Sequence, residues 1–535
     1  MKTFLIAIFL LAYALCYGQQ QKPRLVVGVV VDQMAQEYLY RFGSRFGDDG
    51  FKKLMNDGFQ LRNVHYNYVP TYTGPGHASI FTGTTPAVHG VTGNYWFSKS
   101  LGSMIYCAGD NTEQTVGSAS DKGKMSPRNM LTTTFADELL LSNQKRSKSV
   151  GVSIKDRGAI FPAGHLGQAY WYDHTNGKFI TSTYYADKLP QWVEKFNQRK
   201  LADTYLKRKW EPLYDIDTYT ASGPDKSPYE GKIEGKEAVF PYDLSSHRDY
   251  SLLPGTPFGN DILLDMALAA LEGEQLGKGD YTDFLSVSFS STDYIGHDFG
   301  PNSVELEDTY LRLDKNIASL IRALDMQVGK DNYILFLTSD HAVAEVPQFL
   351  IDSKVPAGYF SIDLKHEITA ALSQRYGDGE WVRNVSNMQI FLNRELIFNK
   401  GIKLHEVQEF AAHYILQYDG LLESYPAYVI NWLDYAAGGI KGLLARGYNQ
   451  KRSGDVLYSL EPAWLDSKRS TGTTHGSAFT YDTHVPLLWY GANITPGVSV
   501  SYTEITDIVP TLCLMLEIKL PNGVTGQPIE ELFKN

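Results

Sequence analysis

Two aspartate–histidine pairs in this chain have the residue types that bind divalent metal ions. Asp293 and His297 follow the apolar run of FLSVSFSSTDYIGHDFG, and Asp340 and His341 follow that of YILFLTSDHA. Carboxylates and imidazoles are common ligands of such ions. Each apolar run predicts a buried strand, and open α/β sheets bind ligands beyond the carboxyl ends of their strands. We therefore expect the two pairs to lie together and to hold two metal ions in one site.

Two further ligands complete the predicted set. Asp32 ends the aliphatic run RLVVGVVVD, and His475 lies in RSTGTTHGSAF, where Gly472 and Gly476 suit a tight loop that presents the imidazole. His484 is the alternative, although it directly precedes an apolar strand and can be structural. A single Asp or His of this kind usually has an ordinary polar role, but several of them together at the ends of successive strands favour a metal site. Three carboxylates with three imidazoles suit zinc, whereas an all-oxygen shell would suit Mg²⁺ or Ca²⁺.

A hydroxyl that could act as a nucleophile lies in PTYTGPGHASIFTG. Thr73 stands where a helix is expected to begin, and free backbone amides and the helix dipole attract anions to such a position. Metal coordination would lower the pKa of the hydroxyl. The alternative is that Thr73 only caps the helix. Thr71 and Ser79 are rival nucleophiles, although Ser79 is expected inside the helix.

The remaining pattern predicts the elements that position these residues. Aliphatic runs alternate with helical patterns, the clearest helix having apolar residues at helical spacing from Leu306 to Leu324. Asn302 and Glu305 suggest a capping box at its start. Because this helix lies between the two strands with metal pairs, the segment is a crossover unit of a parallel sheet. We predict an α/β fold with a central, mostly parallel sheet sandwiched by helices.

The predicted organisation is one catalytic domain over residues 19–535. Two less regular stretches, at about 159–250 and 345–465, are interpreted as insertions that cap the sheet rather than extend it. Residues 1–18 have a charged start, a short apolar core and a polar exit, which predicts a signal peptide cleaved after Gly18. A membrane anchor, the alternative, needs about 20 apolar residues. The protein is therefore expected in the periplasm or secreted, without a stable membrane anchor.

The composition of the chain bears on its binding partners and on the state of its cysteines. The net charge of −11 and the absence of a strong basic run argue against nucleic acid as a binding partner. The protein is expected to be a monomer. Cys107 and Cys513 remain after export; an oxidising compartment permits a disulfide, but a free core thiol is an equal alternative for Cys513.

These motifs resemble the alkaline phosphatase superfamily, the two-zinc hydrolases that include nucleotide pyrophosphatase/phosphodiesterases. The chain resembles more closely the phosphate-irrepressible alkaline phosphatases of flavobacteria. The resemblance covers essentially the whole mature chain, and its motifs, beyond the strand that ends in Asp32, are TGPGH, GNYWF, KDRGAI, TDYIGHDFG, TSDHA, GTTHGS and TDIVPTL. It implies a role for each matched residue. One zinc ion would be held by Asp293, His297 and His475, and the other by Asp32, Asp340 and His341. Thr73 would approach the second ion as nucleophile.

Three further residues are implied to contact the phosphoryl group: Asn94, Lys155 and Arg157. Residues two apart share a face in an extended segment, so Lys155 and Arg157 could both point into the site while Asp156 points away. A phosphate monoester carries two negative charges and a diester one, so two cations favour the monoester. In the resembling family this pair is associated with monoesterases. The alternative is a solvated surface turn.

The expected reaction is hydrolysis of small-molecule phosphate monoesters through a covalent phosphothreonine. A phosphodiesterase or nucleotide pyrophosphatase of the same superfamily is the alternative. A sulfatase would need a Cys or Ser in place of Thr73, and a cofactor-independent mutase would be cytoplasmic. An inactive secreted binding protein is the non-enzymatic alternative, which the intact ligand set disfavours.

Overall fold

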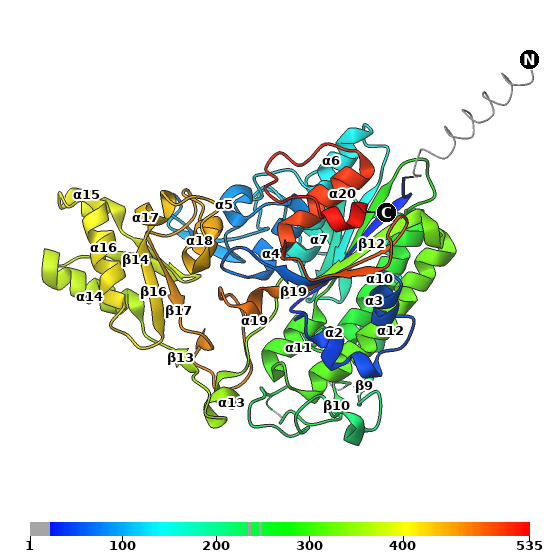
Figure 1. Cartoon of the computed structure of the whole chain (residues 1–535), viewed down its shortest axis with the longest axis horizontal. Helices are drawn as coiled ribbons and strands as arrows, with labels where there is room; N and C mark the ends of the chain where they lie inside the picture. Colours follow the sequence, from blue (N-terminus) through cyan, green and yellow to red (C-terminus); the bar gives the residue numbers. More distant parts are fainter. Residues whose placement is uncertain (1–21, 234, 236, 246–248, 535) are drawn as a thin grey trace, which may run out of the picture.

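The computed structural model describes residues 22–534, apart from 234, 236 and 246–248. The predicted signal peptide at residues 1–18 lies outside the described residues. An eleven-stranded sheet runs through the main body, with helices on both faces (Figure 1). The predicted α/β class with a mostly parallel central sheet is confirmed.

The centre of the sheet is a block of parallel strands. Its spatial order is β12 (Tyr333–Thr338), β1 (Leu25–Val31), β11 (Asp283–Phe289), β6 (Ser149–Ser153) and β7 (Gln168–Asp173). All residues of β12, β1, β11 and β6 are buried, as expected for strands covered on both faces. Val31 pairs with Phe289 and Val30 with Thr338, so three strands end at one level.

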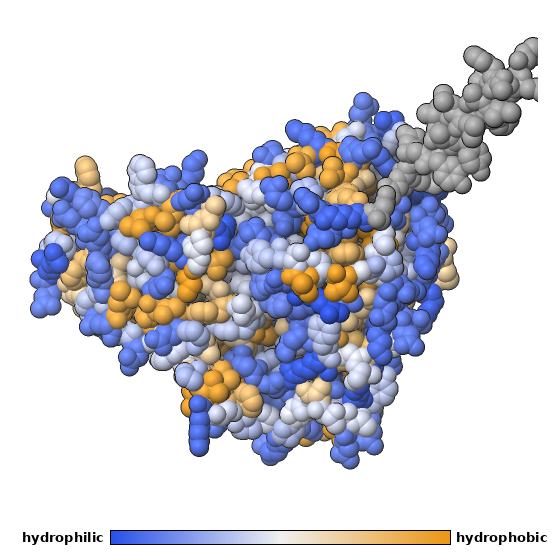
Figure 2. All heavy atoms as spheres, viewed as in Figure 1, coloured by the Kyte–Doolittle hydropathy of each residue, from blue (hydrophilic) through white to orange (hydrophobic). Residues whose placement is uncertain are grey.

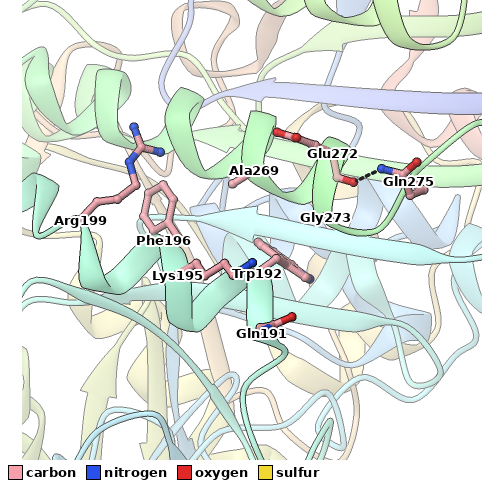
Figure 3. Close-up of a pocket in the computed structure, with 9 residues that line it drawn as sticks. All are labelled: Gln191, Trp192, Lys195, Phe196, Arg199, Ala269, Glu272, Gly273 and Gln275. Carbon is pink, nitrogen blue, oxygen red and sulfur yellow. Dashed lines mark hydrogen bonds between the residues drawn. The ribbon is translucent and has the colours of Figure 1, made fainter.

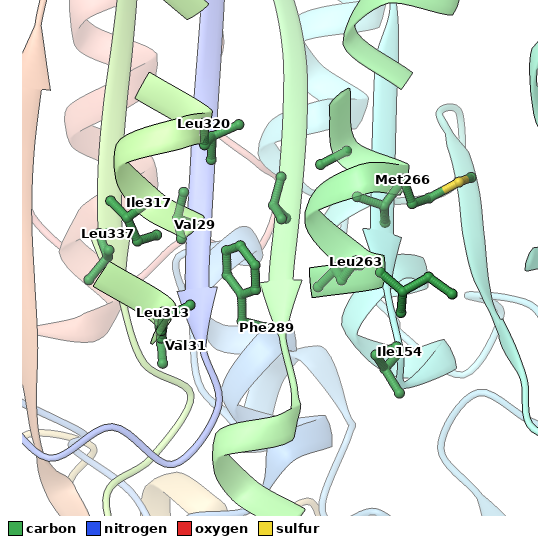
Figure 4. Close-up of a cluster of buried hydrophobic side chains, with 14 of the residues drawn as sticks. Val29, Val31, Ile154, Leu263, Met266, Phe289, Leu313, Ile317, Leu320 and Leu337 are labelled. Carbon is green, nitrogen blue, oxygen red and sulfur yellow. The ribbon is translucent and has the colours of Figure 1, made fainter. Parts of the chain in front are cut away.

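Both faces of this block carry apolar cores. Helices α10 (Phe258–Gly273) and α12 (Val304–Gln327) cover one face, where Leu263, Leu313 and Ile317 pack near strand residues such as Val29 and Phe289 (Figure 4). The other face is covered by α4 (Thr73–Thr82), α6 (Phe135–Ser142) and α20 (Ile508–Leu516). The two cores fix the sheet, and with it the level at which the strands end.

The start of α12 differs from the prediction. Its cap is Ser303, whose hydroxyl accepts a hydrogen bond from the backbone amide of Leu306. Asn302 instead bonds Arg41, and Glu305 accepts a hydrogen bond from Tyr242. The capping box was wrong because both side chains have tertiary partners that their spacing does not reveal.

The first irregular stretch, 159–250, also differs in part. Within it, β7 and β8 (Lys178–Ser182) form an antiparallel hairpin that extends the main sheet. The expectation that the whole stretch only caps the sheet was therefore wrong up to Ser182. The run QAYWYD is rich in Tyr and Trp, and its aromatic side chains are buried rather than exposed.

The second irregular stretch contains a separate lobe. Its four-stranded antiparallel sheet has the order β14 (Val382–Ser386), β15 (Gln389–Leu392), β17 (Val456–Leu460) and β16 (Leu421–Pro426). Helices α14 (Leu364–Tyr376) and α16 (Leu404–Ile415) pack on it around their own core. This capping lobe lies beside the main body, and the visible face of both parts mixes hydrophilic with scattered apolar side chains (Figures 1 and 2).

The tip of the β14–β15 hairpin reaches the main body. Asn387 and Met388 form its turn, and both have positive φ angles, 54° and 55°. The Asn387 side chain donates a hydrogen bond to the backbone carbonyl of Tyr95, with an Nδ2–O distance of 2.6 Å. The lobe thus contacts β3 (Tyr95–Ser98) directly after Asn94.

Cys107 and Cys513 are both buried free thiols. The sequence left open whether these cysteines form a disulfide or remain free thiols, and in the structure both are free. Among the described helices, none combines the length and the apolar character needed to cross a bilayer.

Candidate active site

Three aspartates meet at the carboxyl edge of the parallel block. Asp32 follows β1, Asp340 lies two residues after β12, and Asp293 is in the first turn of α11 (Ser291–Phe299), which follows β11. All three are buried. Because β1 lies between β11 and β12, the register of the strands brings the three carboxylates together.

The imidazoles of His341, His475 and His297 surround these carboxylates. The His341 Nε2 atom lies 3.5 Å from Asp32 Oδ1 and 4.0 Å from Asp293 Oδ1. The His475 Nε2 atom is 3.7 Å from Asp293 Oδ1, and the His297 Nε2 atom is 3.2 Å from the same oxygen. All six residues singled out in the sequence are therefore in one cluster.

Two groups within this cluster have donor atoms close enough to share an ion. The donor atoms of Asp32, Asp340 and His341 all lie within 4.8 Å of one another, and so do those of Asp293, His341 and His475. His341 belongs to both groups. The sequence assigned His341 to one ion and His297 to the other, and that assignment stays a prediction. His297 borders the second group, because its Nε2 atom lies 3.2 Å from Asp293 Oδ1.

The hydrogen bonds of the three histidines prepare them for metal binding. Each Nδ1 donates to a backbone carbonyl: His297 to Thr473 at 2.8 Å, His341 to Ala342 at 2.9 Å and His475 to Thr71 at 2.6 Å. This fixes the tautomer in which Nε2 carries the lone pair, as is typical of metal-ligating histidines. All three Nε2 atoms face the carboxylates.

The alternative ligand His484 lies elsewhere. Its Nε2 bonds the backbone carbonyl of Arg62 at 2.9 Å, and its ring stacks on His65 with centroids 4.6 Å apart. The choice of His475 over His484 therefore agrees with the geometry.

The carboxylate of Asp32 is incompletely compensated by positive charge within the described part of the protein. The Lys155 Nζ atom lies 2.6 Å from Asp32 Oδ2 and 2.6 Å from Asp293 Oδ2. Three buried carboxylate oxygens have no hydrogen-bond partner of normal geometry in the described part of the chain: both oxygens of Asp32 and Oδ2 of Asp340. Burial raises the pKa of Asp32 well above its usual range, and the charges of Asp293 and Asp340 raise it further. Buried carboxylates of this kind require compensation, so the donor set fits divalent cations.

Thr73 is the first residue of α4, and Tyr72 occupies the cap position. Its Oγ1 lies 3.4 Å from Nε2 of His341, the imidazole common to both ligand groups. Thr73 is therefore not the cap residue, and its hydroxyl lies at the metal cluster.

The rival hydroxyls have other partners. Thr71 donates to the backbone carbonyl of Ser477 at 3.0 Å. Ser79 lies inside α4, and its Oγ is 3.0 Å from Nε2 of His89. Of the three candidates, Thr73 has the position that a nucleophile requires.

The glycines of TGPGH allow α4 to approach the cluster. A Cβ atom on Gly76 would lie 2.3 Å from the backbone oxygen of Asp340, and one on Gly74 would lie 3.0 Å from Oδ1 of Asn94. The Gly74 amide donates to that Asn94 oxygen at 2.7 Å. The Nδ2 group of Asn94 therefore retains its donors beside Thr73.

Lys155 and Arg157 reach the site from a different local structure than predicted. Lys155 caps α7 (Asp156–Ala163) and Arg157 lies within that helix, so the expected extended segment was wrong. Arg157 Nη1 donates to the Tyr106 hydroxyl at 3.1 Å. Burial lowers the pKa of Arg157, but Tyr106 and other neighbours, including Asp32, raise it by more. Lys155 therefore contacts the carboxylate cluster directly, whereas the side chain of Arg157 contacts Tyr106.

Comparison with known proteins agrees with this geometry. The family model described as "Type I phosphodiesterase / nucleotide pyrophosphatase" matches residues 26–482. The chain belongs to this family, within the alkaline phosphatase superfamily. The resemblance inferred from the motifs is thus confirmed.

Individual relatives in the superfamily match nearly the full chain. Alkaline phosphatase PafA from Elizabethkingia meningoseptica is 43% identical over 96% of this chain and 95% of its own length. A protein from Myroides odoratus named "Calcium-transporting ATPase" is 44% identical over 96% of this chain and 95% of its own. The crystal structure of wild-type alkaline phosphatase PafA has a TM-score of 0.93 at 43% identity, covering 96% of this chain and 99% of that one.

Two residues that support the site in this superfamily member were missed in the sequence. The backbone N–H of Gln33 donates to Asp340 Oδ1 at 3.2 Å. The side-chain Nε2 of Gln33 donates to Asp293 Oδ1 at 2.9 Å. Its φ of 65° is left-handed, so the chain turns sharply after Asp32. Only adjacency to Asp32 could have pointed to it.

The second missed residue is Asp482. Its Oδ2 accepts hydrogen bonds from the amides of Gly476 and Ser477, at 3.0 and 2.7 Å, and its carbonyl accepts one from Ala342 at 2.8 Å. Asp482 therefore holds the loop of His475 against the residue after His341. No spacing in the sequence indicates this role.

A separate cavity of about 460 Å³ lies between α8 (Gln191–Gln198) and α10 (Figure 3). Trp192, Lys195 and Arg199 line it, and none of the predicted site residues does. The cavity is therefore distinct from the metal cluster.

We expect Gly76→Ala to destabilise the protein by about 1–3 kcal/mol, the usual cost of overpacking, because the new methyl group would collide with the backbone of Asp340. Chemical denaturation measures this change, and metal analysis should show weaker ion retention. Gly43→Ala is the control, because a Cβ there meets nothing within 4 Å. Equal stabilities of the two variants would contradict the predicted contact.

Removing bound metal should also lower stability, because the buried carboxylates would lose their compensation. A site filled at 1,000 times its Kd contributes about 4 kcal/mol, which calorimetry with and without a chelator can measure. The Tm of Asp32→Asn should respond less to the chelator, since one of the repelling charges is gone. An unchanged Tm of the unsubstituted protein on chelation would count against a metal centre.

Proposed function

We propose that this protein is an exported alkaline phosphatase that hydrolyses phosphate monoesters with two zinc ions and a covalent phosphothreonine. The observation that carries the proposal is the position of the Thr73 hydroxyl, at the start of α4 and 3.4 Å from the imidazole shared by both ligand groups. Near-full-length identity of 43% to an alkaline phosphatase supports it.

The residues present fit two zinc ions. Mixed imidazole and carboxylate ligands are typical of zinc. One ion would be held by Asp32, Asp340 and His341, and the other by Asp293 and His475 together with His297. When bound, the ions would lower the pKa of the nucleophile and neutralise charge on the leaving oxygen.

Thr73 would supply the nucleophile. Thr73 Oγ1 loses its proton to solvent and forms a bond to phosphorus as the bond from phosphorus to the ester oxygen breaks, and the alcohol departs with a proton from solvent. Water then attacks the phosphothreonine, which releases inorganic phosphate and restores the hydroxyl. The start of α4 favours the anionic phosphoryl group during both steps.

Three polar side chains would stabilise the phosphoryl oxygens. Asn94 can donate from Nδ2 because its Oδ1 is held by Gly74. Lys155 and Arg157 add positive charge. Lys155 and a bound cation compete for Asp32 and Asp293, so ion binding would free the ammonium for the substrate. Each such donor typically contributes about 10²–10³ in rate.

Two positive side chains favour a dianionic substrate over a monoanionic one. This charge argument supports a monoesterase over the phosphodiesterase also covered by the family's description. The name of the Myroides relative concerns ATP, whose terminal phosphoryl group is also highly charged, so the proposed chemistry covers it. The inactive binding protein stays disfavoured, since all six ligand residues are in one cluster.

Export is proposed from residues 1–18 alone, whose pattern is that of a cleaved signal peptide. The mature protein would act in the periplasm or outside the cell as a monomer. Phosphate esters released in that compartment would be its substrates.

The zinc-loaded enzyme should hydrolyse an aryl phosphate monoester much faster than the matching methyl diester. Changing Lys155 and Arg157 together to Ala should reduce the monoester rate by at least about 10²-fold, the effect of losing one such donor, and the diester rate by much less. Steady-state kinetics on both substrates measure this, with exposed Lys330→Ala as control. Equal losses on both substrates would remove the argument for a monoesterase.

Thr73→Ala should abolish the covalent intermediate, because the rival hydroxyls of Thr71 and Ser79 have other partners. Acid quenching with labelled substrate, followed by mass spectrometry, should find phosphothreonine at residue 73 in the unsubstituted enzyme only. Thr71→Ala is the matched control and should still be labelled. A labelled protein in the Thr73→Ala variant would disprove the assignment.

A further inference from the structure

His77 is a buried histidine beside the site that has no role in the chemistry above. It lies in α4 one turn after Thr73 and has no exposed surface. Its Nδ1 is 3.0 Å from the backbone carbonyl of Thr73 and 3.4 Å from Oδ2 of Asp340, while its Nε2 is 2.9 Å from Oγ of Ser288. One side chain thus contacts three elements: the nucleophile helix, the loop after β12, and β11.

The partners of His77 define its tautomer. A carbonyl oxygen can only accept, so the proton is on Nδ1 and is directed at the Thr73 carbonyl with the Asp340 carboxylate beside it. In the neutral ring, Nε2 then accepts from the Ser288 hydroxyl. Both ring nitrogens are therefore occupied by protein groups, and His77 is in neither candidate ligand group.

The hydrogen bonds continue beneath the site. The Ser153 hydroxyl donates to the carbonyl of Ser288 at 3.2 Å and accepts from the amide of Lys155 at 3.1 Å. A Cβ on Gly158 would lie 2.6 Å from Ser153 Oγ and 2.8 Å from Ser288 Oγ, so α7 closes tightly over this network. The network therefore joins the nucleophile turn to the residue that caps α7.

We propose that His77 is a positioning residue that fixes the Thr73 turn relative to Asp340, and that Ser288 sets the ring orientation needed for this. The inference rests on the proposed function of the same site. Its physical basis is that Nδ1 donates to the backbone carbonyl of Thr73 and lies 3.4 Å from the Asp340 carboxylate of the ligand group. Displacing a reacting group by about 1 Å can cost about 10²-fold in rate.

Two isosteric substitutions separate the contacts of the ring. In His77→Asn the amide nitrogen can occupy the place of Nδ1, which keeps the donor to the Thr73 carbonyl beside Asp340 but loses the contact with Ser288. In His77→Gln the amide group reaches toward Ser288 and loses the Nδ1 position. His89→Gln is the control, because His89 is equally buried and contacts Ser79 rather than the metal cluster.

The measurements are zinc retention during dialysis against a graded chelator, phosphothreonine yield at residue 73, and kcat and KM with an aryl phosphate. We expect His77→Gln to lose about 10- to 100-fold in zinc affinity, as for removal of groups that orient metal ligands. Its kcat should fall by about 10²-fold with little change in KM. His77→Asn should recover most of both losses, and His89→Gln should keep both values even if its Tm falls.

Equal zinc affinity and equal phosphothreonine yield in His77→Asn and His77→Gln would overturn the proposal. If His77→Gln does not fold, Ser288→Ala provides the same test. Without the Ser288 hydroxyl the imidazole of His77 loses a partner, so zinc affinity and kcat should fall in part. A Ser288→Ala enzyme with unchanged zinc affinity and kcat would then overturn the proposal. The zinc measurement also separates this inference from the proposed function. An unsubstituted protein that binds zinc but hydrolyses no phosphate ester would refute the function, while the ranking of the His77 variants would still decide the role of His77.

Discussion

The structure depends on the burial of three carboxylates at the end of one parallel sheet. Charges of the same sign repel strongly in a medium of low dielectric constant, and Asp32, Asp293 and Asp340 are all buried. The Lys155 ammonium is in direct contact with two of them, Asp32 and Asp293. Such an arrangement is costly for folding, so its presence indicates that the sheet edge is built for cations rather than for stability.

Contacts from several other segments fix the side chains at this edge of the sheet. The three histidines are oriented by backbone carbonyls of other loops, so each imidazole depends on a segment remote in sequence. Gly76 lets α4 pack against the backbone of Asp340, and Asp482 joins the loops of His475 and His341. The positions of the ligands are therefore set by tertiary contacts, with local helix or strand geometry supplying only the starting direction.

The sequence predicted the parts that rest on local pattern. Apolar runs that end in Asp32, Asp293 and Asp340 indicated the parallel block and its carboxyl edge, and the composition of the motifs indicated His475 over His484. It failed where a side chain has a remote partner: the expected cap of α12 and the local structure around Lys155. Gln33, Asp482 and His77 could not be identified either, because one sequence does not show which backbone atoms will lie beside a ligand.

The hairpin tip of the capping lobe has a consequence beyond the lobe itself. Asn387 holds the carbonyl of Tyr95, and the preceding residue, Asn94, is in turn held by the amide of Gly74 next to the nucleophile. A chain of two hydrogen bonds therefore runs from an insertion with its own hydrophobic core to the first turn of α4. The length and register of a surface hairpin therefore help to set the position of the residue that precedes Tyr95, and with it a contact of the first turn of α4.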